Sequence, residues 1–150
     1  MYRRCIITEK HRRTVMMALG RAHRAWGDHM RSVACEMGIP DSYRTVIMFL
    51  SRNPGANQKN IAEFSNKTTA AVNQTVKEMI TKGYVEKETD TNDRRYTRLF
   101  LTEKGSEVAL KMRERLHDSD EKITSLITSE KEEEMIKLLD MISDLIRREM

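Results

Sequence analysis

The chain has few residues that interrupt helices and no long hydrophobic segment. Its 150 residues include only two prolines and six glycines, a composition that favours long helices over many short strands. No apolar run approaches the roughly 20 residues needed to cross a bilayer, and no long apolar segment follows the basic start at Met1–Arg4. We therefore expect a soluble, cytoplasmic protein of one domain with no membrane partner.

Residues suited to catalysis or metal binding are also scarce. Cys5 and Cys35 are the only cysteines, and they form no CxxC pair, which indicates a reducing compartment and no disulfide framework. Cys35 follows Val33 and Ala34 in a helical pattern, so we expect it to be a small core residue. The four histidines are scattered, and no nucleophile–base pair, phosphate loop or zinc-ligand spacing is evident. The sequence therefore predicts a protein that is not an enzyme and holds no metal or cofactor.

Charged residues are plentiful and unevenly distributed. They make up 33% of the chain, and the net charge is +4. Residues 1–31 carry eight basic and two acidic side chains, whereas residues 114–150 carry six basic and eleven acidic ones. A basic N-terminal helix can therefore meet an acidic C-terminal helix, within a subunit or across a dimer; the alternative is two solvated faces.

Both ends of the chain carry long apolar stripes at helical spacing. The spacing predicts a first helix from about Thr8 to Met37, and a last helix that starts at the capping-box pattern Ser129–Glu132. A helix as long as the first, about 45 Å at 1.5 Å per residue, extends beyond a small domain and usually packs on another helix. The stripes consist of Val15, Leu19, Ala22, Trp26, Met30, Val33 and Met37, and of Met135, Leu138, Leu139, Ile142, Leu145 and Ile146.

Between these stripes lie two short amphipathic helices. Asn57 is the expected N-cap of the first, which runs to Phe64, and Thr68 is the expected N-cap of the second. Lys82-Gly83 ends the second helix with a cation in the last turn and a glycine after it. The residues expected to face inward are Ile61, Ala62 and Phe64 in the first helix and Val72, Val76, Met79 and Ile80 in the second.

Two alternating segments follow the short helices directly. Tyr84–Glu88 and Arg95–Leu101 alternate as half-buried strands do, and Asp90–Asp93 between them has turn chemistry. Thr102 is expected to cap a helix that ends or bends at about Ser119. The predicted fold is mainly α with a small β-wing. Such a winged helix-turn-helix places one helix in the DNA major groove and a hairpin along the backbone.

The exposed side of the second short helix carries residues suited to base edges. Asparagine and glutamine amides can pair with adenine, and threonine and alanine methyl groups suit a thymine methyl. The alternative is an ordinary polar solvent face, but the hairpin that follows favours DNA binding. The candidate residues are Thr68, Thr69, Ala70, Ala71, Asn73, Gln74 and Lys77.

The expected hairpin, or wing, is basic at its tip. Arg94 and Arg95 follow Asp93, and Arg98 lies on the returning strand. One tip arginine can enter a narrow minor groove, where the negative potential is concentrated, while Asp93 holds the other. The sequence leaves open which arginine does which.

The stretch Asp93–Gly105 resembles the wing signature of the MarR family of transcriptional regulators. That signature is Asp-Arg-Arg, then alternating apolar residues, then Leu-Thr-x-x-Gly. Thr68–Gly83 and the following Tyr84-Val85 are similar to the family's recognition helix and its exit. The flanking helices also fit, so the resemblance covers essentially the whole chain.

The resemblance implies an obligate homodimer with interlocked terminal helices. Residues 1–37 are then a dimerisation helix, residues 38–105 the winged helix-turn-helix, and residues 106–150 the linking and C-terminal dimerisation helices of a single compact domain. It also implies a repressor of a pseudo-palindromic operator in double-stranded DNA, released by a small aromatic or phenolic effector. The alternatives are a winged-helix protein-interaction module that does not read DNA, and a redox-sensing regulator based on Cys5.

Overall fold

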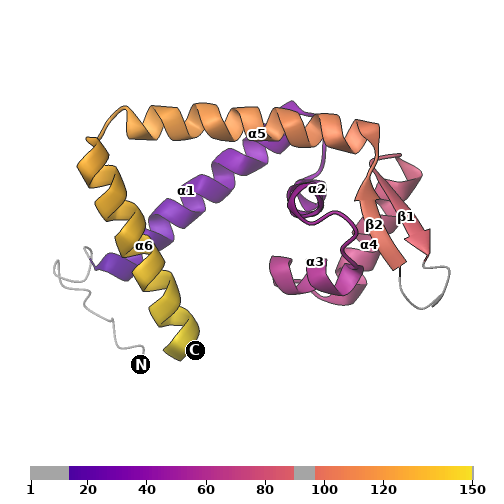
Figure 1. Ribbon diagram of the computed structural model, residues 1–150, viewed down its shortest axis with the longest axis horizontal. Coiled ribbons are helices and arrows are strands. Elements are labelled where there is room, and N and C mark those ends of the chain that lie inside the picture. The colour runs from indigo at the N-terminus through magenta and orange to yellow at the C-terminus, as the bar shows by residue number, and fades with distance from the viewer. Residues whose placement is uncertain (1–13, 90–96, 150) are drawn as a thin grey trace, which may run out of the picture. The chain divides into compact units, whose positions relative to one another are not determined.

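The computed structural model describes residues 14–89 and 97–149, which form six helices and one two-stranded antiparallel sheet (Figure 1). The chain divides into two compact units, the first ending at Ala109 and the second beginning at Leu110. The predicted fold class, mainly α with a small β-wing, is confirmed. The elements are α1 (Val15–Glu36), α2 (Asp41–Arg52), α3 (Gln58–Ser65), α4 (Thr69–Thr81), β1 (Val85–Thr89), β2 (Thr97–Leu101), α5 (Glu103–Thr124) and α6 (Ser129–Glu149).

The two short helices of the first unit, α3 and α4, begin at the predicted caps. The Asn57 side chain accepts from Asn60 N at 3.0 Å, and the Asn60 side chain accepts in return from Asn57 N at 3.1 Å. Thr68 Oγ1 accepts from Ala71 N at 3.2 Å at the start of α4. Between them Asn66 adopts a left-handed backbone, φ 51°, which ends α3. Local hydrogen bonds therefore define both limits of this turn.

The start of α1 differs from the prediction. The helix begins at Val15 and not at Thr8, because Thr14 has an extended backbone with ψ 151°. Its hydroxyl accepts a hydrogen bond from Met17 N at 3.3 Å and so caps the first turn.

Two helix limits in the second unit also differ from the prediction. α5 runs on to Thr124 and has neither an end nor a break near Ser119, because no glycine or proline interrupts residues 106–128 and its polar side chains are solvated. α6 begins at Ser129, which is therefore its first helical residue and not its cap. Glu132 N donates to the carbonyl of Thr128 at 3.0 Å, so Thr128 occupies the capping position.

The base of the wing is fastened to the helix-turn-helix. β1 and β2 pair with Lys87 opposite Leu99. Leu99 N also donates to Ala56 O at 3.0 Å, and Gly55 N donates to Leu99 O at 2.9 Å. Leu99 is fully buried, so its side chain and its backbone both hold the hairpin to the loop between α2 and α3.

Two predicted core residues lie at the surface. Phe64 is 57% exposed, because it lies in the last turn of α3 and its ring packs only at the edge of the core, 4.9 Å from that of Phe49 between centroids. Cys35 is also exposed. The buried stripe of α1 passes through Val33 and Ala34, and Cys35 lies beside it. Ile61, Ala62, Val72, Val76 and Met79 are buried as predicted, and Ile80 is half-buried.

Much of the apolar surface at the two ends of the chain is exposed. The buried residues of α1 all lie in its C-terminal half, whereas Val15 is 64% and Trp26 42% exposed. α6 has no buried residue, although it carries a full apolar stripe. Within the described residues, no helix combines the length and the apolarity that crossing a membrane requires.

Candidate nucleic-acid interface

α4 presents a polar outer face because its apolar side is fixed in the core. Val72, Val76 and Met79 are buried on the inner side. Six of the seven residues predicted from the sequence are exposed, and the seventh, Asn73, is half-buried. The six exposed residues are Thr68, Thr69, Ala70, Ala71, Gln74 and Lys77.

Two side chains of this face are less available than the sequence indicates. The Oδ1 atom of Asn73 is buried and has no hydrogen-bond partner, so this amide lies partly behind the surface. Gln74 Nε2 donates to Glu78 Oε1 at 2.8 Å. The Gln74 amide must therefore break this hydrogen bond, or share it, before it pairs with a base. The sequence prediction missed Glu78, although its spacing of four from Gln74 places it on the same helix face.

A hollow lies where α3 turns into α4. Lys59 and Lys67 are among its lining residues, and Lys59 Nζ lies 3.8 Å from Glu63 Oε1. Free backbone N–H groups and the helix dipole favour an anion at the start of α4. The hollow therefore suits a DNA phosphate, and Lys67, directly before the predicted Thr68 cap, was its signal in the sequence. Its lining residues are Lys59, Ala62, Glu63, Asn66, Lys67, Thr68 and Thr69.

The wing is described only up to its base. Arg98 lies on β2, opposite Glu88 of β1, and its side chain is exposed. Asp93, Arg94 and Arg95 lie outside the described residues. The roles predicted for these three residues therefore stay predictions.

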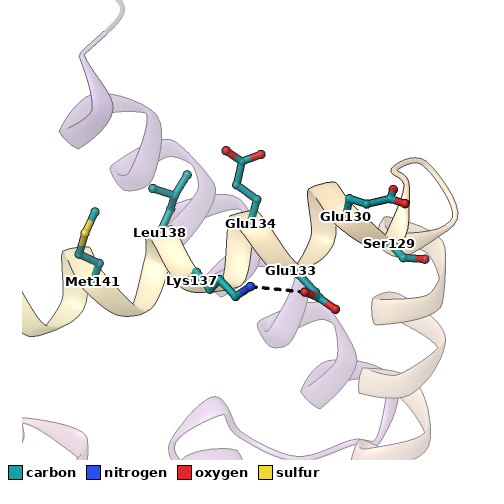
Figure 2. Close-up of a pocket in the computed structure, with 7 residues that line it drawn as sticks. All are labelled: Ser129, Glu130, Glu133, Glu134, Lys137, Leu138 and Met141. Atoms are coloured by element: carbon teal, nitrogen blue, oxygen red, sulfur yellow. Dashed lines mark hydrogen bonds and ion pairs between the residues drawn. The ribbon is translucent and has the colours of Figure 1, made fainter.

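The second unit has a hollow along α6, shown in Figure 2. Lys137 and Glu133 form an ion pair across it at 3.4 Å, and both side chains are exposed. Because every lining residue comes from α6, the hollow is an open strip of helix surface and not an enclosed ligand pocket. Its lining residues are Ser129, Glu130, Glu133, Glu134, Lys137, Leu138 and Met141.

The helix-turn-helix and the first strand lie in a segment that matches the model of a known protein family. A model of the MarR family matches residues 37–95, which include α2, α3, α4 and β1. Over these residues the chain is similar to the MarR family of transcription regulators. MarR proteins are transcription regulators and not enzymes.

A curated transcriptional regulator is also similar to the chain. It is YybA of Bacillus subtilis, an uncharacterized HTH-type transcriptional regulator, which is 33% identical over 99 residues. The match covers 65% of this chain and 65% of YybA.

Solved MarR structures match over nearly the full length. A MarR protein from Peptoclostridium difficile has a TM-score of 0.77 at 23% identity, with 99% of this chain and 94% of that chain covered. The transcriptional repressor CouR, bound to a 23-mer DNA duplex, has a TM-score of 0.73 at 20% identity, with 87% and 92% covered. At these identities the likeness shows a shared fold.

Proposed function

We propose that this protein is a cytoplasmic, homodimeric repressor that reads a pseudo-palindromic operator in double-stranded DNA. The observation that carries the proposal is the outer face of α4, six exposed small or polar residues on a helix whose other side is fixed in the core. The hairpin base tied to the α2–α3 loop supports it. CouR supports it too, because a protein of the same fold is seen on duplex DNA.

Each part of the surface has a distinct role in this proposal. Ala70 and Ala71 let the helix backbone approach the floor of the major groove, and Gln74 pairs with an adenine edge. Lys77 contacts a phosphate. Arg94 and Arg95 reach the backbone or the minor groove from the wing tip.

Dimerisation and effector release complete the proposal. The exposed apolar residues of α1 and α6 call for a partner helix, and a second copy of the chain supplies it. A symmetric dimer places two copies of α4 on half-sites about 34–36 Å apart. A small aromatic or phenolic effector that binds one arrangement of the dimer better than the other lowers DNA affinity by linkage.

Fluorescence anisotropy with the gene's own upstream DNA tests the proposal. We expect a Kd of about 10⁻⁸ to 10⁻¹¹ M for the specific site, a strong salt dependence, and much weaker binding to random DNA of equal length. Salicylate, used as the aromatic probe, should raise the Kd. The proposal is contradicted if upstream and random DNA bind alike.

A matched pair of double variants tests the wing. Arg94→Ala with Arg95→Ala should weaken binding, whereas Lys111→Ala with Arg113→Ala, which removes the same charge from exposed positions of α5, should leave it nearly unchanged. If both double variants bind like the wild type, the wing assignment is wrong.

A further inference from the structure

The C-terminal end of α4 is fastened to the start of α5 by residues that the proposed DNA contacts do not include. We name this group the α4–α5 joint; it consists of Lys82, Gly83, Tyr84, Thr102 and Lys104. All five residues belong to the first unit. At the joint, the start of α5 lies beside the C-terminal end of α4. The hairpin connects these two helix ends.

Two side chains from the α5 side donate to carbonyls at the end of α4. Thr102 Oγ1 donates to Gly83 O at 2.7 Å and accepts from Gly105 N at 3.1 Å, so one hydroxyl serves both helices. Lys104 Nζ donates to Lys82 O at 2.8 Å. The last carbonyls of a helix have no partner within it and carry partial negative charge. A lysine ammonium is therefore well suited to this position.

The same ammonium also lies over an aromatic ring. Lys104 Nζ is 4.1 Å from the ring centroid of Tyr84, within cation–π range. The Tyr84 ring meets that of Tyr43 edge-on, with centroids 5.8 Å apart at an angle of 69°. Tyr43 lies in α2 and is fully buried. Lys104 thus contacts the core through the Tyr84 ring, which packs on the buried Tyr43. It contacts the end of α4 through the Lys82 carbonyl.

We propose that Lys104 is a positioning residue for DNA recognition, which holds α4 in its reading orientation without touching DNA. The inference rests on the proposed function, because it assigns α4 to base reading. If the joint loosens, a smaller fraction of molecules holds α4 correctly. The apparent Kd rises as that fraction falls.

Three variants of the full-length protein test this assignment by DNA binding at several salt concentrations. Lys104→Met keeps the aliphatic stem and removes the charge and the donor. We expect its Kd to rise by up to about fivefold, the limit set by the loss of one net hydrogen bond. Lys104→Arg retains a cation and donors, so it should restore binding. Lys111→Met removes one charge from an exposed position of α5 and should bind like the wild type.

The salt dependence separates positioning from direct contact. A positioning residue leaves the slope of log Kd against log salt unchanged, whereas loss of a phosphate contact lowers it by about 1. Hydrogen exchange supplies a second readout: the amides of Gly83 and Tyr84, bonded to Ile80 O and Met79 O, should exchange faster in Lys104→Met.

An unchanged Kd for Lys104→Met, a reduced slope, or no rescue by arginine overturns the inference. If the wild type binds no DNA, the proposed function fails instead. The exchange rates then decide whether Lys104 holds the end of α4 at all.

Discussion

Among the six glycines, Gly105 has the least room for a side chain. A Cβ atom added there would overlap the carbonyl oxygen of Tyr84 and crowd the side chain of Leu101. The first turn of α5 therefore packs directly on the backbone that leaves α4. This contact explains physically why the Leu-Thr-x-x-Gly pattern ends in glycine: Thr102 caps the helix, and the position three residues later tolerates no side chain.

Gly105→Ala should lower the free energy of unfolding by about 2 kcal/mol, because the backbone must shift to admit the methyl group. Gly20→Ala is the matched control, since the same methyl in α1 would meet only the guanidinium of Arg24 at 3.6 Å. That control should raise stability by up to about 1 kcal/mol. Urea unfolding at one fixed protein concentration measures both variants. Equal effects would contradict the steric account.

Lys77 offers a residue-scale test of how α4 meets DNA. Its side chain is exposed on the proposed reading face, and a phosphate contact carries no base information. Lys77→Ala should weaken binding to all sequences by a similar factor and lower the salt slope by about 1. Loss of affinity for one operator base alone would instead assign Lys77 to base reading. Lys111→Ala, an exposed lysine of α5, is a control for net charge.

At the scale of whole elements, the sequence predicts helix limits well where they depend on neighbouring residues. Asn57 and Thr68 cap α3 and α4 because each side chain reaches a backbone N–H three residues on. The predicted start of α1 at about Thr8 was too early, because it extended the helix beyond its apolar stripe, which begins at Val15 directly after the Thr14 cap. The outer face of α4 followed from periodicity alone.

Burial was harder to predict, since it depends on what packs against each position. Phe64 and Cys35 have apolar or small side chains in helical patterns, yet both are exposed. Each lies near the C-terminal end of its helix, where the described residues leave its side chain exposed. Likewise, periodicity could not reveal that the Asn73 amide is half-buried or that Lys104 reaches back to α4.

The first turn of α6 provides a prediction about pH. Hydrogen bonds from the Glu130 backbone N–H and from the Thr128 hydroxyl hold the pKa of the Glu130 carboxyl below its usual value. A pKa depressed in the folded state gives stability that is present at neutral pH and is lost as pH falls through that lowered pKa.

Thr128→Val should therefore raise the pKa of Glu130 toward its ordinary value, as measured by an NMR titration of the side-chain carboxyl. Ser125→Ala is the control, because the Ser125 hydroxyl donates to Lys122 O and not to Glu130. An unchanged pKa in Thr128→Val would show that the backbone N–H alone is responsible.

At the scale of the whole molecule, the main feature is the exposed apolar stripes of α1 and α6. Leu138, Leu139 and Leu145 of α6 are 47%, 42% and 56% exposed. At about 25 cal/mol per Å² of apolar surface buried, covering such a stripe contributes substantially to association. Glu133, Asp140 and Asp144 lie on the other side of the helix and are exposed.

The stripe leads to a prediction about assembly. Leu138→Glu with Leu145→Glu places two charges in the stripe, where burial against a second copy would leave them unpaired. The variant should sediment as a monomer at micromolar concentration, where the wild type sediments as a dimer. Arg147→Glu changes the charge by the same two units on the opposite, exposed side of α6, so it should remain dimeric. Because binding of a second copy stabilises the folded state by mass action, the Tm of the wild type should rise with protein concentration and that of the stripe variant should not. A monomeric wild type with a concentration-independent Tm would contradict the dimer, and with it the spacing of two copies of α4 on one operator.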